Sequence, residues 1–432
     1  MPTHTLIRSV ILSIFLLTGC LVTGSVTIAA ENWTSYRGPA NQGDVGNVEL
    51  PLKWSESENI VWKTPLEGKA WSSPVIWGDR IYVTSASEDG TQLWAECLDR
   101  NSGKGVWKKQ LRQVVAPQYC HPFNSYASPS PVIEEGRLYV SFGSPFNACL
   151  DTSNGNVLWE RTDFVCNHFR GAGSSPFLYK DLLILNFDGA DRQYVVAMDK
   201  RTGKTVWETK RSVNFKDADA AGQVDREGDL RKAFSTPVLV EVNGKPVLIS
   251  LGSMALYAYN PDDGKEIWRV ELIGSHSGSP RPVIGHGLVY SPMGMGRELW
   301  AVRPDGQGVV TDTHVVWKYN RAVPSRASIL LVGDLIFMVD DGGVAACVDA
   351  KTGKEQWRQR IGGNFSASPI HANGKVYFFS QEGKTTVIEA SPTYKELAGN
   401  TLDDGLMASP AVYDQTLFLR TKTHMYRIET KR

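Results

Sequence analysis

The chain has 432 residues, and its 46 Lys and Arg residues balance its 46 Asp and Glu residues, so the formal net charge is zero. This neutrality gives no electrostatic reason to expect nucleic acid or an anionic membrane surface as a partner. Hydrophobic residues make up 42% of the chain, which is enough for a large core and too few for a membrane protein. The 40 glycines, 22 prolines and 13 tryptophans indicate many turns and a recurring aromatic position, as in an all-β repeat protein.

Residues 1–30 have the pattern of a signal peptide. Arg8 precedes an apolar stretch at residues 10–17 that is too short to span a bilayer. Two processing routes fit the sequence. In one, the Leu-Thr-Gly-Cys sequence at residues 17–20 is a lipobox, and Cys20 is acylated; in the other, ordinary signal peptidase cuts after Ala30. Both routes predict export, either to the periplasm or to the outer membrane as an anchored lipoprotein, with no transmembrane span.

The strongest signal in the sequence is an internal repeat. A run of a polar residue, usually Pro, and two or more apolar residues occurs eight times. The runs begin at Ser73, Ser130, Ser175, Thr236, Arg281, Ser328, Ser368 and Ser409. Eight copies of one short strand signal predict eight equivalent structural units.

Each run is followed by a second strand, a third strand that ends in Asp or a similar residue, a tight turn and a fourth strand. The second strands, such as residues 80–83 and 137–140, alternate apolar and polar positions, which is typical of half-buried β-strands. Turns such as Thr352-Gly353 place Gly where a tight hairpin needs a positive φ. The repeat therefore predicts four antiparallel strands in each unit.

A Trp recurs in the fourth strand, at Trp62, Trp107, Trp159, Trp207, Trp268, Trp317 and Trp357. Trp62 precedes the first run, whereas the last unit, at residues 409–428, lacks a fourth strand. We therefore expect residues 60–63 to complete the last unit and to close a ring, which removes two exposed sheet edges. The predicted fold is an all-β, eight-bladed β-propeller over residues 59–432, preceded by an arm at residues 31–58 that lies over the outside.

The repeat resembles the pyrroloquinoline quinone (PQQ) propeller repeat over nearly all of residues 59–432. The features that carry the resemblance are, in order along each unit, Ser-Pro, Leu-Tyr-Val, Ala-Leu-Asp, Thr-Gly-Lys and Trp. The quinoprotein alcohol dehydrogenases and the BamB-like envelope proteins share this repeat. The resemblance implies a quinoprotein alcohol dehydrogenase-like propeller in which each Trp packs against the neighbouring blade. The segments at 119–124 and 166–171 also resemble secreted bacterial PQQ-like propellers, and they contain His121, Asn124 and His168.

The longest segments, 111–126, 161–173 and 211–234, all link one blade to the next, and such links meet on one face of a propeller. Binding residues are commonly loop residues on a rigid scaffold. Counting back six residues from each strand-opening Pro predicts a ring of side chains at the channel mouth: Gly68, Ser125, Arg170, Arg231, His276, Val323, Gly363 and Asp404. With Arg326 nearby, this ring forms a cationic arc for a carboxylate, sulfate or phosphate group. The eight candidate ligand-binding residues at the channel mouth are Arg170, Arg231, His276, Arg326, Asp404, His121, Asn124 and His168. The alternative is that these charges are solvated or paired with neighbouring acids.

The cysteines allow three arrangements. Cys120 and Cys166 lie on equivalent links of adjacent blades, so we expect a disulfide between them. A metal site from Cys120, His121, Cys166 and His168, or free thiols, are the alternatives. Cys97, Cys149 and Cys347 take the third-strand position that Ala197 occupies elsewhere, which indicates buried small apolar residues.

No strong catalytic residue emerges from the sequence. It contains neither the adjacent Cys-Cys pair of the quinoprotein alcohol dehydrogenases nor a Cys-x-x-Cys-His haem motif. Since a fold does not imply a function, the repeat alone does not support bound PQQ, and we predict no cofactor. We expect a monomeric, non-catalytic scaffold that binds envelope proteins. The alternatives are a PQQ-dependent dehydrogenase-like enzyme and a protein that binds an anionic glycan at the channel mouth.

Overall fold

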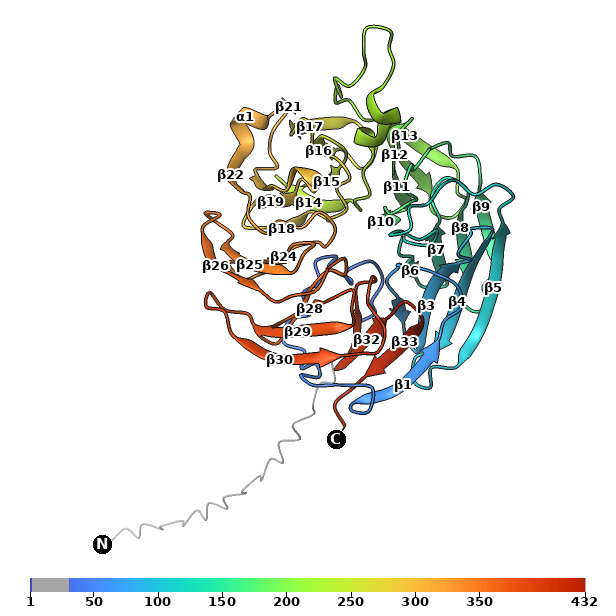
Figure 1. Ribbon diagram of the computed structural model, residues 1–432, viewed down its shortest axis with the longest axis vertical. Helices are drawn as coiled ribbons and strands as arrows, with labels where there is room; N and C mark the ends of the chain where they lie inside the picture. The colour runs from blue at the N-terminus through green and yellow to red at the C-terminus, as the bar shows by residue number, and fades with distance from the viewer. Residues whose placement is uncertain (2–30, 432) are drawn as a thin grey trace. The chain divides into compact units, whose positions relative to one another are not determined.

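A computed structural model describes Met1 and residues 31–431. Residues 31–431 form a closed ring of eight antiparallel four-stranded blades around a central channel (Figure 1). The predicted eight-bladed β-propeller is therefore confirmed. We number the blades in chain order from the first complete sheet.

The first four blades cover residues 75–271. Blade 1 contains β2 (Val75–Trp77), β3 (Arg80–Ala86), β4 (Gln92–Asp99) and β5 (Gly105–Gln113); blade 2 contains β6 (Val132–Glu134), β7 (Arg137–Ser141), β8 (Asn147–Asp151) and β9 (Val157–Arg161). Blade 3 contains β10 (Phe177–Tyr179), β11 (Leu182–Asp188), β12 (Gln193–Asp199) and β13 (Thr205–Lys210); blade 4 contains β14 (Val238–Val242), β15 (Lys245–Leu251), β16 (Ala255–Tyr259) and β17 (Glu266–Glu271).

The remaining blades follow the same order. Blade 5 contains β18 (Val283–Gly285), β19 (Leu288–Pro292), β20 (Leu299–Val302) and β22 (Val315–Tyr319); blade 6 contains β23 (Leu330–Val332), β24 (Leu335–Val339), β25 (Val344–Asp349) and β26 (Glu355–Arg360). Blade 7 contains β27 (Ile370–Ala372), β28 (Lys375–Phe379), β29 (Lys384–Glu389) and β30 (Glu396–Thr401). Blade 8 contains β31 (Ala411–Tyr413), β32 (Thr416–Arg420), β33 (His424–Ile428) and β1 (Ile60–Pro65).

Four short elements lie between these strands. The 3-10 helix η1 (Asp225–Arg231) is in the link from blade 3 to blade 4, and η2 (Gly294–Gly296) connects β19 to β20. Helix α1 (Thr311–His314) follows β21 (Gly308–Val309), which pairs in parallel with β17 and so covers the outer edge of blade 4.

The ring closes as the sequence predicts. Strand β1 pairs antiparallel with β33, with Trp62 opposite Arg427 and Pro65 opposite His424. In Figure 1, the blue strand β1 lies beside the red strand β33, although the two are far apart in the sequence. Blade 8 is thus built from both ends of the described chain.

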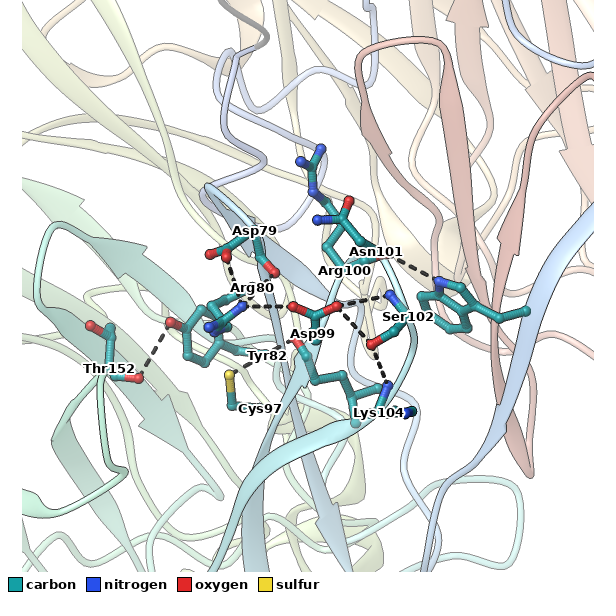
Figure 2. A network of polar contacts seen from close by, with 12 residues as sticks. Asp79, Arg80, Tyr82, Cys97, Asp99, Arg100, Asn101, Ser102, Lys104 and Thr152 are labelled. Carbon is teal, nitrogen blue, oxygen red and sulfur yellow. Dashed lines mark hydrogen bonds and ion pairs between the residues drawn. The ribbon is translucent and has the colours of Figure 1, made fainter. Parts of the chain in front are cut away.

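The turn between the third and fourth strands depends on an Asp. In blade 1, the Asp99 carboxylate accepts hydrogen bonds from the Ser102 backbone N–H and hydroxyl, each at 2.8 Å, and from Arg80 at 2.9 Å (Figure 2). The Ser102 hydrogen bonds lower the pKa of Asp99. Gly103 completes this turn at a φ of +71°, a conformation that side chains disfavour. Asp199 and Asp349 form equivalent turns with Thr202 and Thr352.

The recurring Trp joins each blade to the next, as the resemblance implies. Each indole N–H donates to a backbone carbonyl in the third-to-fourth-strand connection of the following blade, at 2.7–3.1 Å. The indole rings of Trp62, Trp107 and Trp159 also lie on the turn glycines Gly103, Gly155 and Gly203, where an added Cβ would come within 2.6–2.7 Å of them. The seven pairs are Trp62 with Arg100, Trp107 with Thr152, Trp159 with Lys200, Trp207 with Pro261, Trp268 with Pro304, Trp317 with Ala350 and Trp357 with Ser391.

A small residue, Ala or Cys, lies on the third strand opposite six of these seven tryptophans, whereas Trp62 lies opposite Arg427. Cys97 pairs with Trp107, Cys149 with Trp159 and Cys347 with Trp357, and all three cysteines are fully buried. The prediction that these cysteines are buried small apolar residues is confirmed.

Blade 7 lacks the Trp, and the arm supplies a replacement. Ala398 occupies the register position opposite Val387 that Trp occupies in the other blades. Trp54 from the arm stacks on Tyr377, with ring centroids 6.4 Å apart, and its backbone N–H donates to Asn400. Tyr377 is the second-strand aromatic that contacts the Trp of the same blade elsewhere, as Tyr82 contacts Trp107. The indole N–H of Trp54 has no hydrogen-bond partner, so only its packing is reproduced.

The expectation that the arm lies over the outside is wrong for residues 32–46, whereas Leu52 and Trp54 bond to Asn400 on the outermost strand of blade 7. Residues 32–46 run along the innermost strands and hydrogen-bond to several blades. The carbonyls of Trp33 and Thr34 accept from Ile76 in blade 1 and Ile133 in blade 2. The Gln42 side chain accepts from Ile284 in blade 5. These N–H groups lie at strand edges that face the channel and would otherwise be unpaired, which is why the arm is drawn inward.

We expect Trp54→Ala to lower the free energy of unfolding by about 3–5 kcal/mol, because it leaves a large cavity between blade 7 and blade 8. Urea denaturation followed by fluorescence measures this loss. Trp107→Ala is the matched comparison at a regular blade interface, and Trp54→Phe should recover most of the loss. A loss below about 1 kcal/mol for Trp54→Ala would contradict the role given to this side chain.

Candidate functional site

A cavity of about 310 Å³ lies on the axis of the ring and receives side chains from all eight blades. Each blade contributes the residue two positions before the start of its repeat run. At these positions the link from the preceding blade turns inward to begin the innermost strand. The eight residues are Trp71, Ser128, Gly173, Phe234, Ser279, Arg326, Ser366 and Met407.

A ring of hydroxyl groups lies beneath these residues and joins the blades. The Ser130 hydroxyl accepts from the Ser73 N–H at 2.8 Å, and the Ser175 hydroxyl accepts from the Ser130 N–H at 2.9 Å. Four further backbone N–H groups donate in the same way to the hydroxyl of the next blade, at 2.9–3.0 Å. They run from Ser175 to Thr236, from Arg281 to Ser328, from Ser328 to Ser368 and from Ser368 to Ser409. Ser or Thr opens seven of the eight repeat runs, and in six of them the hydroxyl accepts this hydrogen bond from the preceding blade.

The exception, Arg281, holds the arm in place. Its fully buried guanidinium donates to the Tyr36 carbonyl at 3.1 Å and to the Asn41 side chain at 2.7 Å. The Tyr36 hydroxyl in turn contacts the Ser328 and Ser368 hydroxyls, at 3.2 and 2.8 Å. Tyr36 therefore forms the floor of the cavity, and the opposite end is bounded by the links between blades.

The cavity wall is cationic. Arg170, Lys232 and Arg326 line it, and its lining residues, all within the described part of the chain, include no Asp or Glu. Two carboxylates lie behind the wall. Asp229 contacts Lys232 and lies 3.5 Å from Arg170, and Asp341 lies 3.6 Å from Arg326. Three cations against two carboxylates leave a net positive wall.

Two histidines in the wall are held neutral. Burial, with Arg170 and Arg326 nearby, lowers the pKa of His121, and burial with Lys232 nearby lowers the pKa of His276. The Phe123 N–H donates to His121 Nδ1 at 3.1 Å, so the neutral imidazole carries its hydrogen on Nε2.

The links that carry these residues are bonded to one another. The Asn124 amide donates to the carbonyls of Arg170 and Ala172, at 3.0 and 3.1 Å, which joins the link before blade 2 to the link before blade 3. The Trp71 indole donates to the Phe123 carbonyl at 2.9 Å, and the Arg326 guanidinium lies 4.1 Å from the centroid of the Phe123 ring. These contacts fix the wall before any ligand arrives.

The structure brings together five of the eight residues predicted at the channel mouth. Arg170, His276, Arg326, His121 and Asn124 all line the cavity.

The other three predicted residues lie elsewhere, which corrects the predicted ring. Arg231 is paired with Asp217 at 2.6 Å, and Asp404 accepts from the Thr423 N–H and hydroxyl in a neighbouring turn. His168 is buried behind the wall, where its Nε2 accepts from the Ser144 N–H at 3.0 Å. The cationic arc therefore contains Lys232 in place of Arg231. Its three cations, Arg170, Lys232 and Arg326, do not stand at the same distance in sequence from the start of their repeat runs.

Sequence reasoning missed Lys232, Trp71, Phe123 and Tyr36. Counting back six residues from each strand-opening Pro does not find these residues, because the links between blades differ in length and conformation. Counting back two residues from the start of each run finds Trp71 and Arg326, because the backbone next to the innermost strand is equivalent in every blade. No repeat signal marks Tyr36, which belongs to the arm.

The predicted Cys120–Cys166 disulfide is not formed, because both residues are free thiols. Cys166 is buried with its sulfur 3.7 Å from His168 Nδ1, and the Cys120 sulfur faces the Arg170 carbonyl. Burial raises the pKa of Cys120 to about 11, so its thiol is a poor nucleophile at neutral pH. Within the described part of the chain, no group of three or more His, Cys, Asp or Glu residues is placed to hold a metal ion.

The buried His168 predicts a pH dependence of stability. Burial lowers its pKa to about 4, so it stays neutral in the fold, whereas in the unfolded chain it takes up a proton below about pH 6.5. We expect the free energy of unfolding of the native protein to fall by about 2 kcal/mol more than that of His168→Gln between pH 7 and pH 5. Urea denaturation at both pH values measures the difference, and the remaining groups cancel between the two proteins. Equal pH dependence would show that His168 is accessible to protons.

The fold and the repeat define the class of protein: this is a PQQ-like repeat β-propeller. Within that class, the chain belongs to the family described as outer membrane protein assembly factor BamB, whose model matches residues 52–163, 94–291 and 191–431. The BamB of Yersinia pestis is 26% identical over 222 residues, which cover 46% of this chain and 50% of that protein.

Solved structures share the architecture at low identity. BamB from Moraxella catarrhalis superimposes with a TM-score of 0.60 at 11% identity and covers 86% of this chain and 98% of its own. A quinohemoprotein alcohol dehydrogenase from Comamonas testosteroni gives 0.65 at 12% identity and covers 93% of this chain and 81% of its own. At such identities the similarity concerns the fold alone.

The matches span 50–65% of the length of the curated relatives compared. In the residues that the structure describes, there is no helix with the length and apolar character needed to cross a membrane.

Proposed function

We propose that this chain is a non-catalytic scaffold protein of the cell envelope that binds a partner protein across the mouth of its central cavity. The observation that carries the proposal is a set of exposed large apolar side chains, five on links between blades and one, Met295, on the connection from β19 to β20; Phe123 and Met295 also line the cavity. Exposed apolar groups of this kind are typical of interaction sites. They are Val115, Tyr119, Phe123, Val165, Ile273 and Met295.

The mouth suits recognition because it is already ordered. Val115 and Tyr119 are 95% and 63% exposed, yet the link that carries them is bonded to its neighbours through Gln118, whose amide donates to the Cys166 carbonyl at 3.0 Å. A surface fixed in advance loses little conformational entropy on binding. The cationic cavity at its centre adds a requirement for an acidic group on the partner.

The family supports the cellular setting. The relatives named outer membrane protein assembly factor BamB work with envelope proteins, by their names, and residues 1–30 have the pattern of an export signal. We propose that the chain is exported and acts in the periplasm or as an outer-membrane lipoprotein acylated at Cys20. Cys20 lies outside the residues that the structure describes.

The cavity residues do not fit a calcium-bound PQQ. The cations Arg170, Lys232 and Arg326 match the carboxylates of the quinone, but the lining, which lies in the described residues 31–431, has no carboxylate to hold a calcium ion beside it. The sequence also lacks the adjacent Cys-Cys pair that the quinoprotein alcohol dehydrogenases have near PQQ. We therefore propose that the chain does not act as a PQQ-dependent dehydrogenase.

Addition of PQQ and calcium to the purified protein should give no alcohol-dependent reduction of a dye above the rate without protein, because the described residues that line the cavity include no carboxylate to hold calcium beside the quinone. A dye-linked alcohol assay measures this. Dye reduction that requires protein, PQQ, calcium and alcohol together would overturn the non-catalytic proposal.

A photo-crosslinking amino acid at Tyr119 should capture an envelope protein in intact cells, because Tyr119 is exposed at the mouth. The same amino acid at Lys351, on a turn of the opposite face, is the matched control and should capture nothing above background. Immunoblotting and mass spectrometry identify the product. Capture at Lys351 with none at Tyr119 would contradict the assignment of the mouth as the binding surface.

A further inference from the structure

We propose that the central cavity also binds a small carboxylated sugar, with the carboxylate held by Arg170 and Arg326 and the sugar hydroxyls held by the ring of Ser and Thr hydroxyls. This inference goes beyond the scaffold function, since it assigns a small-molecule ligand to the interior of the ring. It rests on four features of the cavity.

The first feature is positive charge without a lining carboxylate. The side chains of Arg170 and Arg326 are 44% and 34% exposed at the cavity, and each meets its carboxylate at 3.5–3.6 Å, longer than a good charged hydrogen bond. The buried Nε of Arg170 has no hydrogen-bond partner. His121 lines the same cavity as both guanidinium groups. A ligand carboxylate in the cavity would accept hydrogen bonds from the parts of the Arg170 and Arg326 guanidinium groups that Asp229 and Asp341 leave without a close partner.

The second feature is a set of unused hydroxyl donors. Ser130, Ser175, Thr236 and Ser409 each accept one backbone N–H from the preceding blade, and among the described residues their own hydroxyl hydrogens have no acceptor. All four line the cavity. A simple inorganic anion would occupy the cationic wall only, whereas a polyhydroxylated ligand would also use these donors.

The third feature is an aromatic wall. Trp71 and Phe123 line the cavity together, joined by the hydrogen bond from the Trp71 indole to the Phe123 carbonyl. The C–H groups on one face of a sugar ring pack well on aromatic rings, while its hydroxyl edge faces polar groups. The cavity thus offers apolar, hydroxyl and cationic surfaces to one ligand.

The fourth feature is shape. The volume of about 310 Å³ is at the small end for ligand sites, and Tyr36 closes the floor. A chain of sugars cannot thread through a closed floor, so the site would take a free sugar acid or the terminal unit of an acidic glycan.

Isothermal titration calorimetry of residues 31–432 with D-galacturonic acid and D-glucuronic acid tests the proposal, with D-galactose and D-glucose as neutral controls. We expect binding of at least one acid and none of the neutral sugars at millimolar concentration. Arg170→Gln and Arg326→Gln should each weaken binding about tenfold, because each removes a charged hydrogen bond. The matched control Arg303→Gln, at an exposed Arg outside the cavity, should leave binding unchanged.

Further titrations separate the sources of the ligand. Tighter binding of the matching oligouronide identifies a glycan end, and equal or weaker binding identifies a free sugar acid. No heat from either acid, or equal binding of sulfate with the same sensitivity to both Gln variants, would overturn the proposal. Thermal unfolding of each variant confirms that it is folded. Because crosslinking at Tyr119 does not depend on the sugar, failure here and failure of the scaffold proposal are distinguishable.

Discussion

The whole structure depends on the contact between the fourth-strand Trp of one blade and the turn of the next. A single four-stranded sheet cannot bury both of its faces, so each blade is stable only when its neighbours cover it. The indole N–H fixes the distance and rotation between adjacent sheets, and the turn glycine lets the ring lie close to the backbone, as Trp62 does at Gly103. A repeated contact of fixed geometry determines how many blades complete the circle.

The arm at residues 31–58 adds two features that the repeat does not encode. It provides the aromatic ring that blade 7 lacks, through Trp54, and it closes one end of the channel with Tyr36. A propeller channel can be entered from both ends when nothing closes it, whereas this one has a floor and a mouth. The cations Arg170, Lys232 and Arg326 and the exposed apolar residues Phe123 and Met295 line the cavity above this floor, where both the proposed protein partner and the proposed sugar would bind.

The sequence allowed the blades, the turns and the ring closure to be predicted because each repeats at nearly constant spacing and follows from local rules. The cavity was harder to predict, because its residues come from links of unequal length. Arg231 is the last residue of η1, inside a long link, and its side chain pairs with Asp217 and does not line the cavity. The roles of Trp54 and Tyr36 could not be predicted at all, since their partners, Tyr377 and Ser368, lie more than 300 residues away and obey no repeat.

The pairing of β1 with β33 has a consequence for biogenesis. Residues 60–65 are synthesised long before their partner strand at 424–428, so the circle stays open until nearly the whole chain has been made. During that interval the two sheets at the gap expose edges that can pair with other chains. A chain that lacks the last strand could not close the circle, and its open sheet edges would stay exposed to pairing with other chains.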